Sequence, residues 1–260
     1  MQVSSRSKLR FALATVVFVA PAVHWLLFAE FEYRGLPASH WLTQLKSPEL
    51  AEREDAFRAL KEIGTRDRRV VPALLDRLDD STMTKDYLCS LGGRVVSPLR
   101  KKLRTGPHLF KLNALGLLQC LGVKTPGVLE TVEELLADSS YDISAYAAGA
   151  LGQFGKQASS TLPALLKWAA EGHVENRAAC LVAMARVTDD PDRVRPILLG
   201  ALHDKEPRIW VAAVNGLTAL GEPPAGVEAR LKELSEEGPY DVQADARWAL
   251  EGWRAASQGK

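Results

Sequence analysis

The sequence has few cysteines, and none of them is placed as a metal or redox site would require. Its three cysteines, Cys89, Cys120 and Cys180, lie far apart, and no C-x-x-C pair occurs. Zinc knuckles and dithiol redox centres depend on such closely spaced pairs. Because all three lie within apolar helical patterns, we expect each to be a small residue of the core.

Motifs of the common catalytic classes are also missing. No two histidines are four residues apart, and no H-E-x-x-H motif occurs. The chain has neither a phosphate-binding glycine loop nor a G-x-S-x-G nucleophile motif. We therefore predict no catalytic residues, no metal site and no cofactor, and expect that the protein is not an enzyme.

A net charge of +1 gives the chain no overall field that would attract nucleic acid, but its charge is unevenly distributed. Residues 30–125 carry 17 basic and 12 acidic side chains, whereas residues 126–260 carry 13 basic and 20 acidic ones. No acidic residue lies between Asp86 and Glu130. The sequence therefore predicts a basic part followed by an acidic part.

The window without acidic residues predicts a contact surface for an anionic partner. Suitable partners are lipid headgroups, an acidic protein or an envelope polyanion. The competing interpretation is a solvated helix face and turn that happen to be basic. The candidate contact residues in this window are Arg94, Arg100, Lys101, Lys102, Arg104 and Lys111.

The N-terminal segment favours a membrane location. Residues 11–29 form an apolar run, preceded by Arg6, Lys8 and Arg10. The 19 residues of the run are close to the ~20 that a helix needs to cross a bilayer. The positive-inside rule then places the N-terminus in the cytoplasm and the remainder of the chain outside it.

Two other interpretations of this segment stay open. Phe11–Ala20 also resembles the apolar region of a secretory signal, and the residues around Ala22 resemble a cleavage site. Cleavage there would release a secreted or periplasmic protein. In the third interpretation the chain is cytoplasmic and begins with an apolar helix, which would bring a nucleic-acid partner back into consideration.

A two-helix pattern recurs along most of the chain. A first helix rich in alanine and leucine ends close to a glycine, and a second helix follows after a loop. The closing positions are 28 to 34 residues apart, with Val187 in the glycine's place in the fifth unit. First helices are predicted to end within 56–64, 86–92, 112–122, 145–155, 178–187 and 211–221, with a seventh at 244–253. Second helices are predicted at 70–78, 95–103, 128–136, 161–169, 194–202 and 227–234.

Elementary helix chemistry explains this pattern. Apolar residues spaced three and four apart, such as Ala56, Leu60 and Ile63, give a helix one apolar face. A glycine just past the helix end supplies the left-handed C-cap position. Small residues, as at 147–150, should let helices approach closely. Because a helix pair of this length cannot cover its own apolar face, we expect stacked neighbours to bury it.

On these residues the units resemble short bacterial HEAT repeats, also called PBS-lyase HEAT-like repeats. The segment 202–221 matches best, and the unit around Leu151 matches in part, with Ser144 near the usual place of an arginine. The resemblance covers about residues 41–255, and the family's members include scaffolds, adaptors and a few enzymes. The matching residues of the best segment are Asp204, Pro207, Arg208, Ala212, Ala213, Ala219, Leu220 and Gly221.

The resemblance also implies that second helices line a concave surface. Trp168 lies on a predicted second helix, so we expect it to form a partner contact together with Lys167. Trp210, Trp248 and Trp253 lie on first helices, where we expect them to be packing residues.

The sequence thus predicts an all-α protein, an α-α superhelix of about six HEAT-like helix pairs with an N-terminal transmembrane or signal helix. Residues 1–29 would be the anchor or signal, 30–40 a linker, 41–255 the repeat solenoid and 256–260 a frayed tail. The expected function is a membrane-anchored scaffold for protein–protein interaction. The alternatives are a lyase-like repeat enzyme or enzyme subunit acting on a bound cofactor, and a nucleic-acid binder if the chain is cytoplasmic.

Overall fold

The structure, a computed structural model, describes residues 30–78, 82–222 and 225–258. The chain divides into two compact units, Met1–Leu74 and Leu75–Lys260, and each is considered by itself. The division falls within helix α4 (Val70–Leu75), the second helix of the first predicted pair. The predicted apolar segment 11–29 lies outside the described residues. Among the helices that are described, none is long and apolar enough to cross a membrane.

The first unit begins with a short hairpin where the sequence predicts only a linker. Strands β1 (Glu32–Tyr33) and β2 (Leu36–Pro37) pair antiparallel, with Arg34 and Gly35 at the turn. Both turn residues have positive φ, at 51° and 73°, as in the primed turns that suit two-residue hairpins. Helix α2 (Ala38–Gln44) follows directly and contacts α3 (Leu50–Ile63).

Trp41 holds this hairpin and α2 together. Its side chain is buried, and its indole Nε1 donates a hydrogen bond to the Leu36 carbonyl at 3.3 Å. The predicted start of the first repeat at residue 41 is therefore three residues late, because Ala38 is already helical and buried. A two-residue strand is too short to show an alternating pattern, so periodicity could not predict it.

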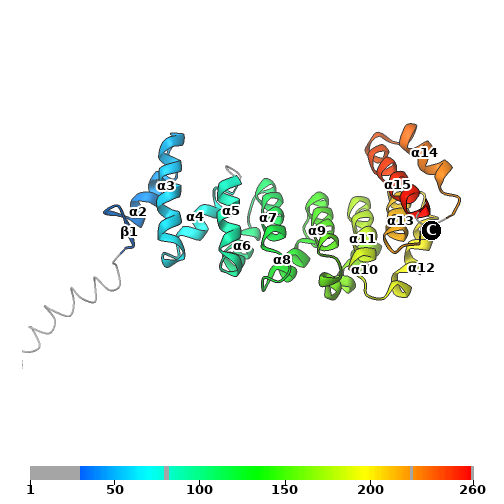
Figure 1. The fold of residues 1–260 in the computed structure, drawn as a ribbon, viewed down its shortest axis with the longest axis horizontal. Helices are drawn as coiled ribbons and strands as arrows, with labels where there is room; N and C mark the ends of the chain where they lie inside the picture. Colours follow the sequence, from blue (N-terminus) through cyan, green and yellow to red (C-terminus); the bar gives the residue numbers. More distant parts are fainter. Residues whose placement is uncertain (1–29, 79–81, 223–224, 259–260) are drawn as a thin grey trace, which may run out of the picture. The chain divides into compact units, whose positions relative to one another are not determined.

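The second unit is a stack of helix pairs, as the sequence predicts (Figure 1). Each first helix contacts the first helix of the next pair. The first helices are α5 (Thr82–Ser90), α7 (His108–Leu121), α9 (Tyr141–Phe154), α11 (Val174–Val187), α13 (Pro207–Ala219) and α15 (Tyr240–Gln258). The second helices are α6 (Val96–Leu103), α8 (Val128–Leu135), α10 (Leu162–Glu171), α12 (Pro191–Ala201) and α14 (Glu228–Glu236). The all-α repeat prediction is confirmed for these residues.

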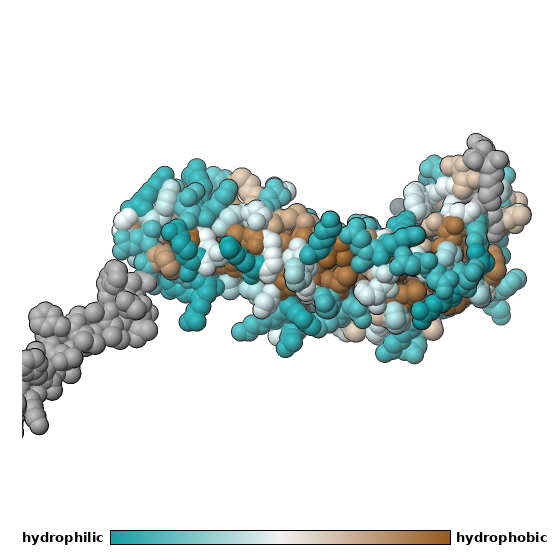
Figure 2. All heavy atoms as spheres, turned by 60° about the horizontal axis from the view of Figure 1, so that its bottom comes forward, coloured by the Kyte–Doolittle hydropathy of each residue, from teal (hydrophilic) through white to brown (hydrophobic). Residues whose placement is uncertain are grey.

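Apolar side chains from each pair are buried against the next pair. Leu118, Leu151 and Leu165 are fully buried, as expected for the apolar face of a repeat helix. Polar side chains surround the stack, and Figure 2 shows apolar surface between them along the second unit. Burial of the apolar faces by neighbouring pairs is the main source of stability in such a stack.

The glycines that close the first helices have the positive φ that the sequence predicts, but Gly64, Gly122 and Gly155 have ψ of −148°, 158° and −145° and so lie outside the predicted left-handed helical position. Gly64, Gly92, Gly122, Gly155 and Gly221 all have positive φ. At Gly122 φ is 76° and ψ is 158°, a combination that essentially only glycine adopts. In the fifth unit, helix α11 ends instead on Thr188, with φ of −68°, so no glycine is needed there.

Close approach between first helices depends on a different glycine from the one predicted. Gly149 faces open space, whereas a Cβ at Gly152 would lie 3.1 Å from the Ala183 Cα on α11. Ala147, Ala148 and Ala150 are fully buried, as expected. Gly152 is therefore the residue that lets α9 and α11 pack closely.

Aspartates in the loops connect consecutive repeats. Asp138 accepts the Ser140 backbone N–H at 3.0 Å and the Lys111 ammonium at 2.6 Å, and so joins α7 to the start of α9.

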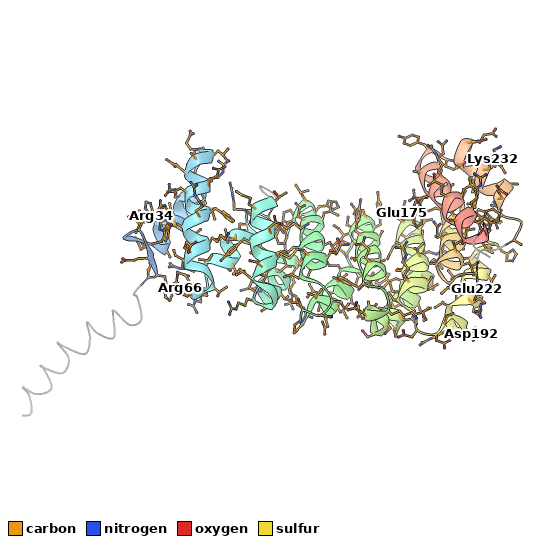
Figure 3. The ribbon with its side chains drawn as sticks, viewed as in Figure 1. Arg34, Arg66, Glu175, Asp192, Glu222 and Lys232 are labelled. Carbon is orange, nitrogen blue, oxygen red and sulfur yellow. A yellow bond between two sulfur atoms is a disulfide. The ribbon has the colours of Figure 1, made fainter. Side chains whose placement is uncertain are left out.

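Arg195 of α12 pairs with two acidic side chains, Asp192 and Glu222, which lie near each other in Figure 3. These charges stabilise the stack itself, so they do not by themselves indicate a binding site.

Candidate binding cleft of the first helices

A cleft of about 410 Å³ lies on the first-helix side of the second unit. Its lining residues come from α9, α11, α13 and α15, and none comes from a second helix. The volume falls within the roughly 300–1,000 Å³ that is typical of ligand-binding clefts. The sequence analysis expected the partner surface on second helices, so the placement of this cleft differs from that expectation.

The cleft is built from the same helix positions in successive repeats. Apart from Tyr141, its lining residues are the second, fifth, sixth and ninth residues of the first helices. These positions share one helix face, since they are spaced three and four apart. Successive first helices thus present equivalent positions to the cleft.

Small residues form the middle of the cleft. Ala145, Ala178, Ala179 and Ala212 occupy its fifth and sixth positions, and none of them is exposed. Gly149 occupies the ninth position of α9, where a Cβ would meet nothing within 4 Å. A side chain or backbone of another molecule can therefore come close to the helix axes here.

Aromatic rings stand at both ends of the cleft. Tyr141 and Tyr146 on α9 are 54% and 62% exposed, and Trp248 on α15 is 55% exposed. The Tyr141 ring stacks on His173 at 5.0 Å between centroids, while the Arg186 guanidinium lies 5.9 Å from the Trp248 ring centroid. Trp248 is thus not the packing residue that the sequence analysis expected, whereas Trp210 is buried in the core as expected.

The charged residues of the cleft are mostly acidic. Asp142, Glu175 and Asp245 supply three carboxylates, and Arg208 supplies the one guanidinium among the lining residues. Arg208 Nη1 lies 3.6 Å from Asp245 Oδ2, so these two charges partly balance each other at the α13–α15 end. Glu175, labelled in Figure 3, lies in the first turn of α11. The α9–α11 end therefore carries the unbalanced negative charge.

Asp142 is held in its ionised form. Burial is the largest single influence and raises its pKa. Hydrogen bonds from the Ser140 hydroxyl and the Ile143 backbone N–H, with the nearby His108, outweigh it and leave the pKa below its usual range. The His108 Nε2 atom lies 2.8 Å from Asp142 Oδ2. Glu175 has a similar neighbour in His173.

Asn215 adds hydrogen-bonding capacity on α13. It is half-buried in the cleft, and its side chain has no hydrogen-bond partner in the part of the chain that the structure describes. A primary amide offers both donors and an acceptor. The carbonyl groups of an extended backbone lying along the cleft could accept hydrogen bonds from the Asn215 amide, and its N–H groups could donate to the amide oxygen.

The basic residues predicted as an anion-binding surface lie on and around α6, and acidic side chains pair with several of them. Arg100 Nε donates to Glu134 Oε2 at 2.9 Å, which raises the pKa of Arg100 and lowers that of Glu134. Lys102 pairs with Asp76 and is partly buried, and burial lowers its pKa. These acidic partners come from neighbouring repeats, outside the window that lacks acidic residues.

The remaining basic residues do not gather into one uniformly basic patch. Lys111 pairs with Asp138, and Arg94 lies on the 3-10 turn Gly92–Arg94 before α6. Lys101 and Arg104 are exposed. A shallow pocket of about 180 Å³ brings Arg100, Arg104 and Lys111 together with Glu134 and Asp138. This surface is mixed in charge, and its binding of an anionic partner stays a prediction.

Trp168 and Lys167 lie on α10, as the sequence predicts for a second helix. The Lys167 Nζ atom lies 5.5 Å from the Trp168 ring centroid, and Trp168 is half-buried. Neither residue lines the cleft. Their predicted part in a partner contact is therefore separate from it.

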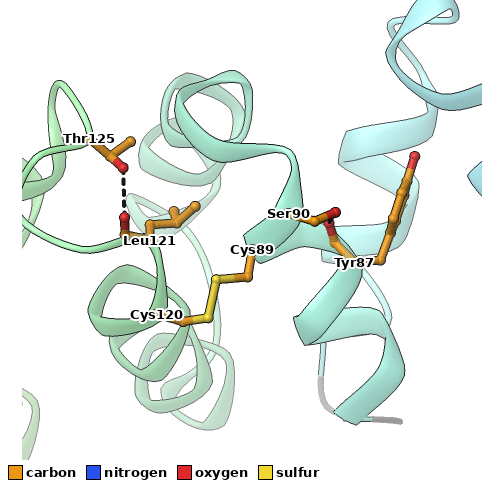
Figure 4. Close-up of a disulfide and its surroundings, with 6 residues drawn as sticks. All are labelled: Tyr87, Cys89, Ser90, Cys120, Leu121 and Thr125. Atoms are coloured by element: carbon orange, nitrogen blue, oxygen red, sulfur yellow. Dashed lines mark hydrogen bonds between the residues drawn. A yellow bond between two sulfur atoms is a disulfide. The ribbon is translucent and has the colours of Figure 1, made fainter.

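Two of the three cysteines form a disulfide, which the sequence analysis did not anticipate. Cys89 at the end of α5 bonds to Cys120 on α7, with their Cα atoms 6.0 Å apart (Figure 4). Cys89 is half-buried and Cys120 is exposed, so neither is a core residue. Their sequence separation of 31 residues is close to one repeat, which places them at matching positions of neighbouring first helices. This separation was the feature of the sequence from which the disulfide could have been predicted.

Cys180 is the small core residue that the sequence predicts. It is fully buried on α11, and burial raises the pKa of its thiol to about 12. Its Sγ atom lies 3.3 Å from Asn176 Oδ1. A buried thiol with so high a pKa is chemically inert at neutral pH.

Within the described ranges, no cluster of three or more His, Cys, Asp or Glu side chains could hold a metal ion. The chain thus offers a binding cleft, without a metal site in the parts that the structure describes. The arrangement suits recognition of an extended chain: small residues in the middle, aromatic rings at the ends, and carboxylates along one side.

Comparisons with known proteins concern the fold. No family model matches the chain, and no curated protein matches its sequence. A designed armadillo repeat protein in complex with the peptide (KR)4 is 17% identical with a TM-score of 0.43, and the match covers 82% of this chain and 98% of that one. The complex of CpcE and CpcF of phycocyanin lyase from Nostoc sp. is 16% identical with a TM-score of 0.37, over 86% and 97%. The helical-repeat fold of the chain is shown by its own stacked helix pairs.

Proposed function

We propose that the protein is a membrane-anchored scaffold that binds an extended segment of a protein partner in the first-helix cleft. The observation that carries this proposal is that the same set of helix positions recurs along the cleft, with all four on α11 and α13, three on α9 and two on α15. Repeat stacking needs the other faces of these helices, and it leaves this face for a ligand.

The length of the cleft supports an extended occupant. Neighbouring packed helices have axes about 8–10 Å apart, so four of them span about 27 Å. An extended chain rises about 3.3 Å per residue, which corresponds to roughly eight or nine residues over this distance.

The membrane part of the proposal rests on the apolar run 11–29 and the basic residues before it. The disulfide between Cys89 and Cys120 supports an extracytoplasmic location for the repeats, because disulfides persist in oxidising compartments. The partner would then be a protein that is present outside the cytoplasm.

The experiment that tests binding in the cleft is site-specific photocrosslinking in native membranes. A benzophenone amino acid replaces Tyr146 or Trp248 in the cleft, and replaces Tyr240, which is 92% exposed outside it, as the matched control. We expect Tyr146 and Trp248 positions to give the same adduct, and the Tyr240 position to give none. Identical adducts from all three positions, or none from the two cleft positions, would contradict the proposal.

A further inference from the structure

The α9–α11 end of the cleft differs from the α13–α15 end in its charge. The second position of the helix is Asp142 on α9 and Glu175 on α11, but it is Arg208 on α13. Asp245, near Arg208, already has a cationic neighbour within the chain. The neighbours of Asp142 and Glu175 are the histidines His108 and His173, which lack the permanent charge of an arginine. An incoming charged group would therefore meet a more negative field at the α9–α11 end than beside Arg208.

Exposed aromatic rings accompany the two carboxylates at this end. Tyr141 and Tyr146 flank the second position of α9, and more than half of each side chain is exposed. The face of a tyrosine ring attracts cations, and guanidinium groups stack on it. Carboxylates beside such rings provide charge as well as hydrogen-bond acceptors for a lysine or arginine head group.

The middle of the cleft suits the aliphatic stem of such a residue. Ala145, Ala178 and Ala179 present methyl groups between the acidic side chains, and Gly149 leaves open space beside them. Lysine and arginine bury their methylene stems on apolar surface while the charged head remains among polar groups. A phosphate or a carboxylate would be repelled by Asp142 and Glu175.

We infer that the α9–α11 end of the cleft is a binding site for a lysine or arginine side chain of the partner's extended segment. The head group lies among Tyr146, Asp142 and Glu175, and its stem lies on the alanines. This inference rests on the proposed function, because it names the partner chemistry of the same cleft.

The test uses the full chain in detergent micelles and an array of random nine-residue peptides. We expect the bound peptides to be enriched in lysine and arginine. For a bound peptide, replacing the arginine with citrulline keeps the shape and removes the charge, and it should weaken binding about tenfold.

Matched variants locate the site. Glu175→Gln and Tyr146→Ser should each weaken peptide binding about tenfold. Glu236→Gln and Tyr240→Ser make the same changes at exposed residues outside the cleft and should leave binding unchanged. Because Tyr146 is 62% exposed, its removal should not disturb folding, which circular dichroism can check.

The outcomes separate this inference from the proposed function. The cation site would be overturned if the bound peptides were acidic or purely apolar. It would also be overturned if the Glu175→Gln and Tyr146→Ser variants bound peptide as the parent does. Either result would leave the peptide-binding function intact. No peptide bound above background would overturn both. If the cleft bound only a second copy of this chain, that copy would be the occupant in place of an extended segment. This result would overturn both the cation site and the proposed function.

Discussion

Arg177 and Asp204 connect two first helices across one repeat. The Arg177 Nη2 atom lies 3.0 Å from Asp204 Oδ2, while Asp204 Oδ1 accepts the backbone N–H of Glu206 at 2.9 Å. One carboxylate thus holds the loop before α13 and joins it to α11. Lys111 and Asp138 repeat the arrangement between α7 and α9.

Asp204→Asn should destabilise the protein at neutral pH by about 1 kcal/mol, because hydrogen bonds to a charged carboxylate are stronger than those to a neutral amide. The Glu206 N–H, and then Arg177, lower the pKa of Asp204 below its usual range against the effect of burial. The carboxylate therefore stabilises the fold above pH ~4, the unfolded-state pKa. That contribution is lost as pH falls through the lower folded-state pKa.

Urea unfolding at pH 7 and at pH 3 measures this difference. We expect the gap between Asp204→Asn and the parent to shrink at the lower pH. Asp189→Asn, at an exposed loop carboxylate, is the control and should behave as the parent does. An equal gap at both pH values would show that ionisation of Asp204 does not contribute.

Two glycines on α9 should respond to alanine in opposite directions. Gly149→Ala places a Cβ in open space and should stabilise the protein by about 0.5–1 kcal/mol, because glycine is unfavourable within a helix. Gly152→Ala places a Cβ 3.1 Å from the Ala183 Cα, a backbone atom that cannot easily move, so it should destabilise. Thermal unfolding of both variants measures the signs, and equal shifts would contradict the packing described for α9 and α11.

Reduction of the disulfide should lower the stability of the repeats. A closed loop of this length corresponds to about 4 kcal/mol of lost unfolded-state entropy, an upper value for a stack that retains its other contacts. Paired urea titrations of Cys89→Ser and the parent, with and without reductant, measure the effect. The reductant should shift only the parent. Thiol labelling of the native, oxidised protein should modify no cysteine, since Cys180 is buried.

Deletion of residues 1–29 should release the protein from membranes, because the proposed anchor is the apolar run within this segment. Alkaline extraction of membranes followed by mass spectrometry of the N-terminus measures this. We expect the intact chain in the pellet and the deleted chain in the supernatant. An N-terminus near Ala22 on a soluble chain would support the cleaved signal instead.

Neutralising Lys101 and Arg104, two exposed members of the basic window, should reduce any salt-sensitive binding to anionic liposomes. The effect should be about 1 kcal/mol for each residue. Arg100→Gln is a poor probe of binding, because it also breaks the pair with Glu134. Unchanged liposome binding in the Lys101 and Arg104 variant would exclude the lipid interpretation of this surface.

The sequence predicted the helix pairs well because their signals are local. Apolar spacing fixed the helix faces, and a glycine such as Gly122 marked the end of a first helix. The second helices at 128–136 and 161–169 correspond closely to α8 and α10. These features depend on a few neighbouring residues, so no tertiary information was needed.

The sequence did not predict the cleft, because the cleft depends on how the repeats are aligned. Tyr146 and Trp248 are about a hundred residues apart in the sequence, and only the stacking of equivalent helix positions places them along one face. In the same way, Glu134 neutralises Arg100 from the next repeat, so a count along the chain overstates the basic charge of the surface. Comparing equivalent positions of successive first helices would have revealed the cleft face, and comparing successive second helices would have brought Arg100 and Glu134 together.

The disulfide between Cys89 and Cys120 also bears on how the stack unfolds. In a linear array each repeat is supported only by its neighbours, so fraying can start at an end and advance one interface at a time. Because a covalent link joins α5 and α7, these two helices should unfold together and not one after the other. Fraying that advances from α15 should therefore halt at α7, and hydrogen exchange should show a step in protection at that helix while the bond is intact.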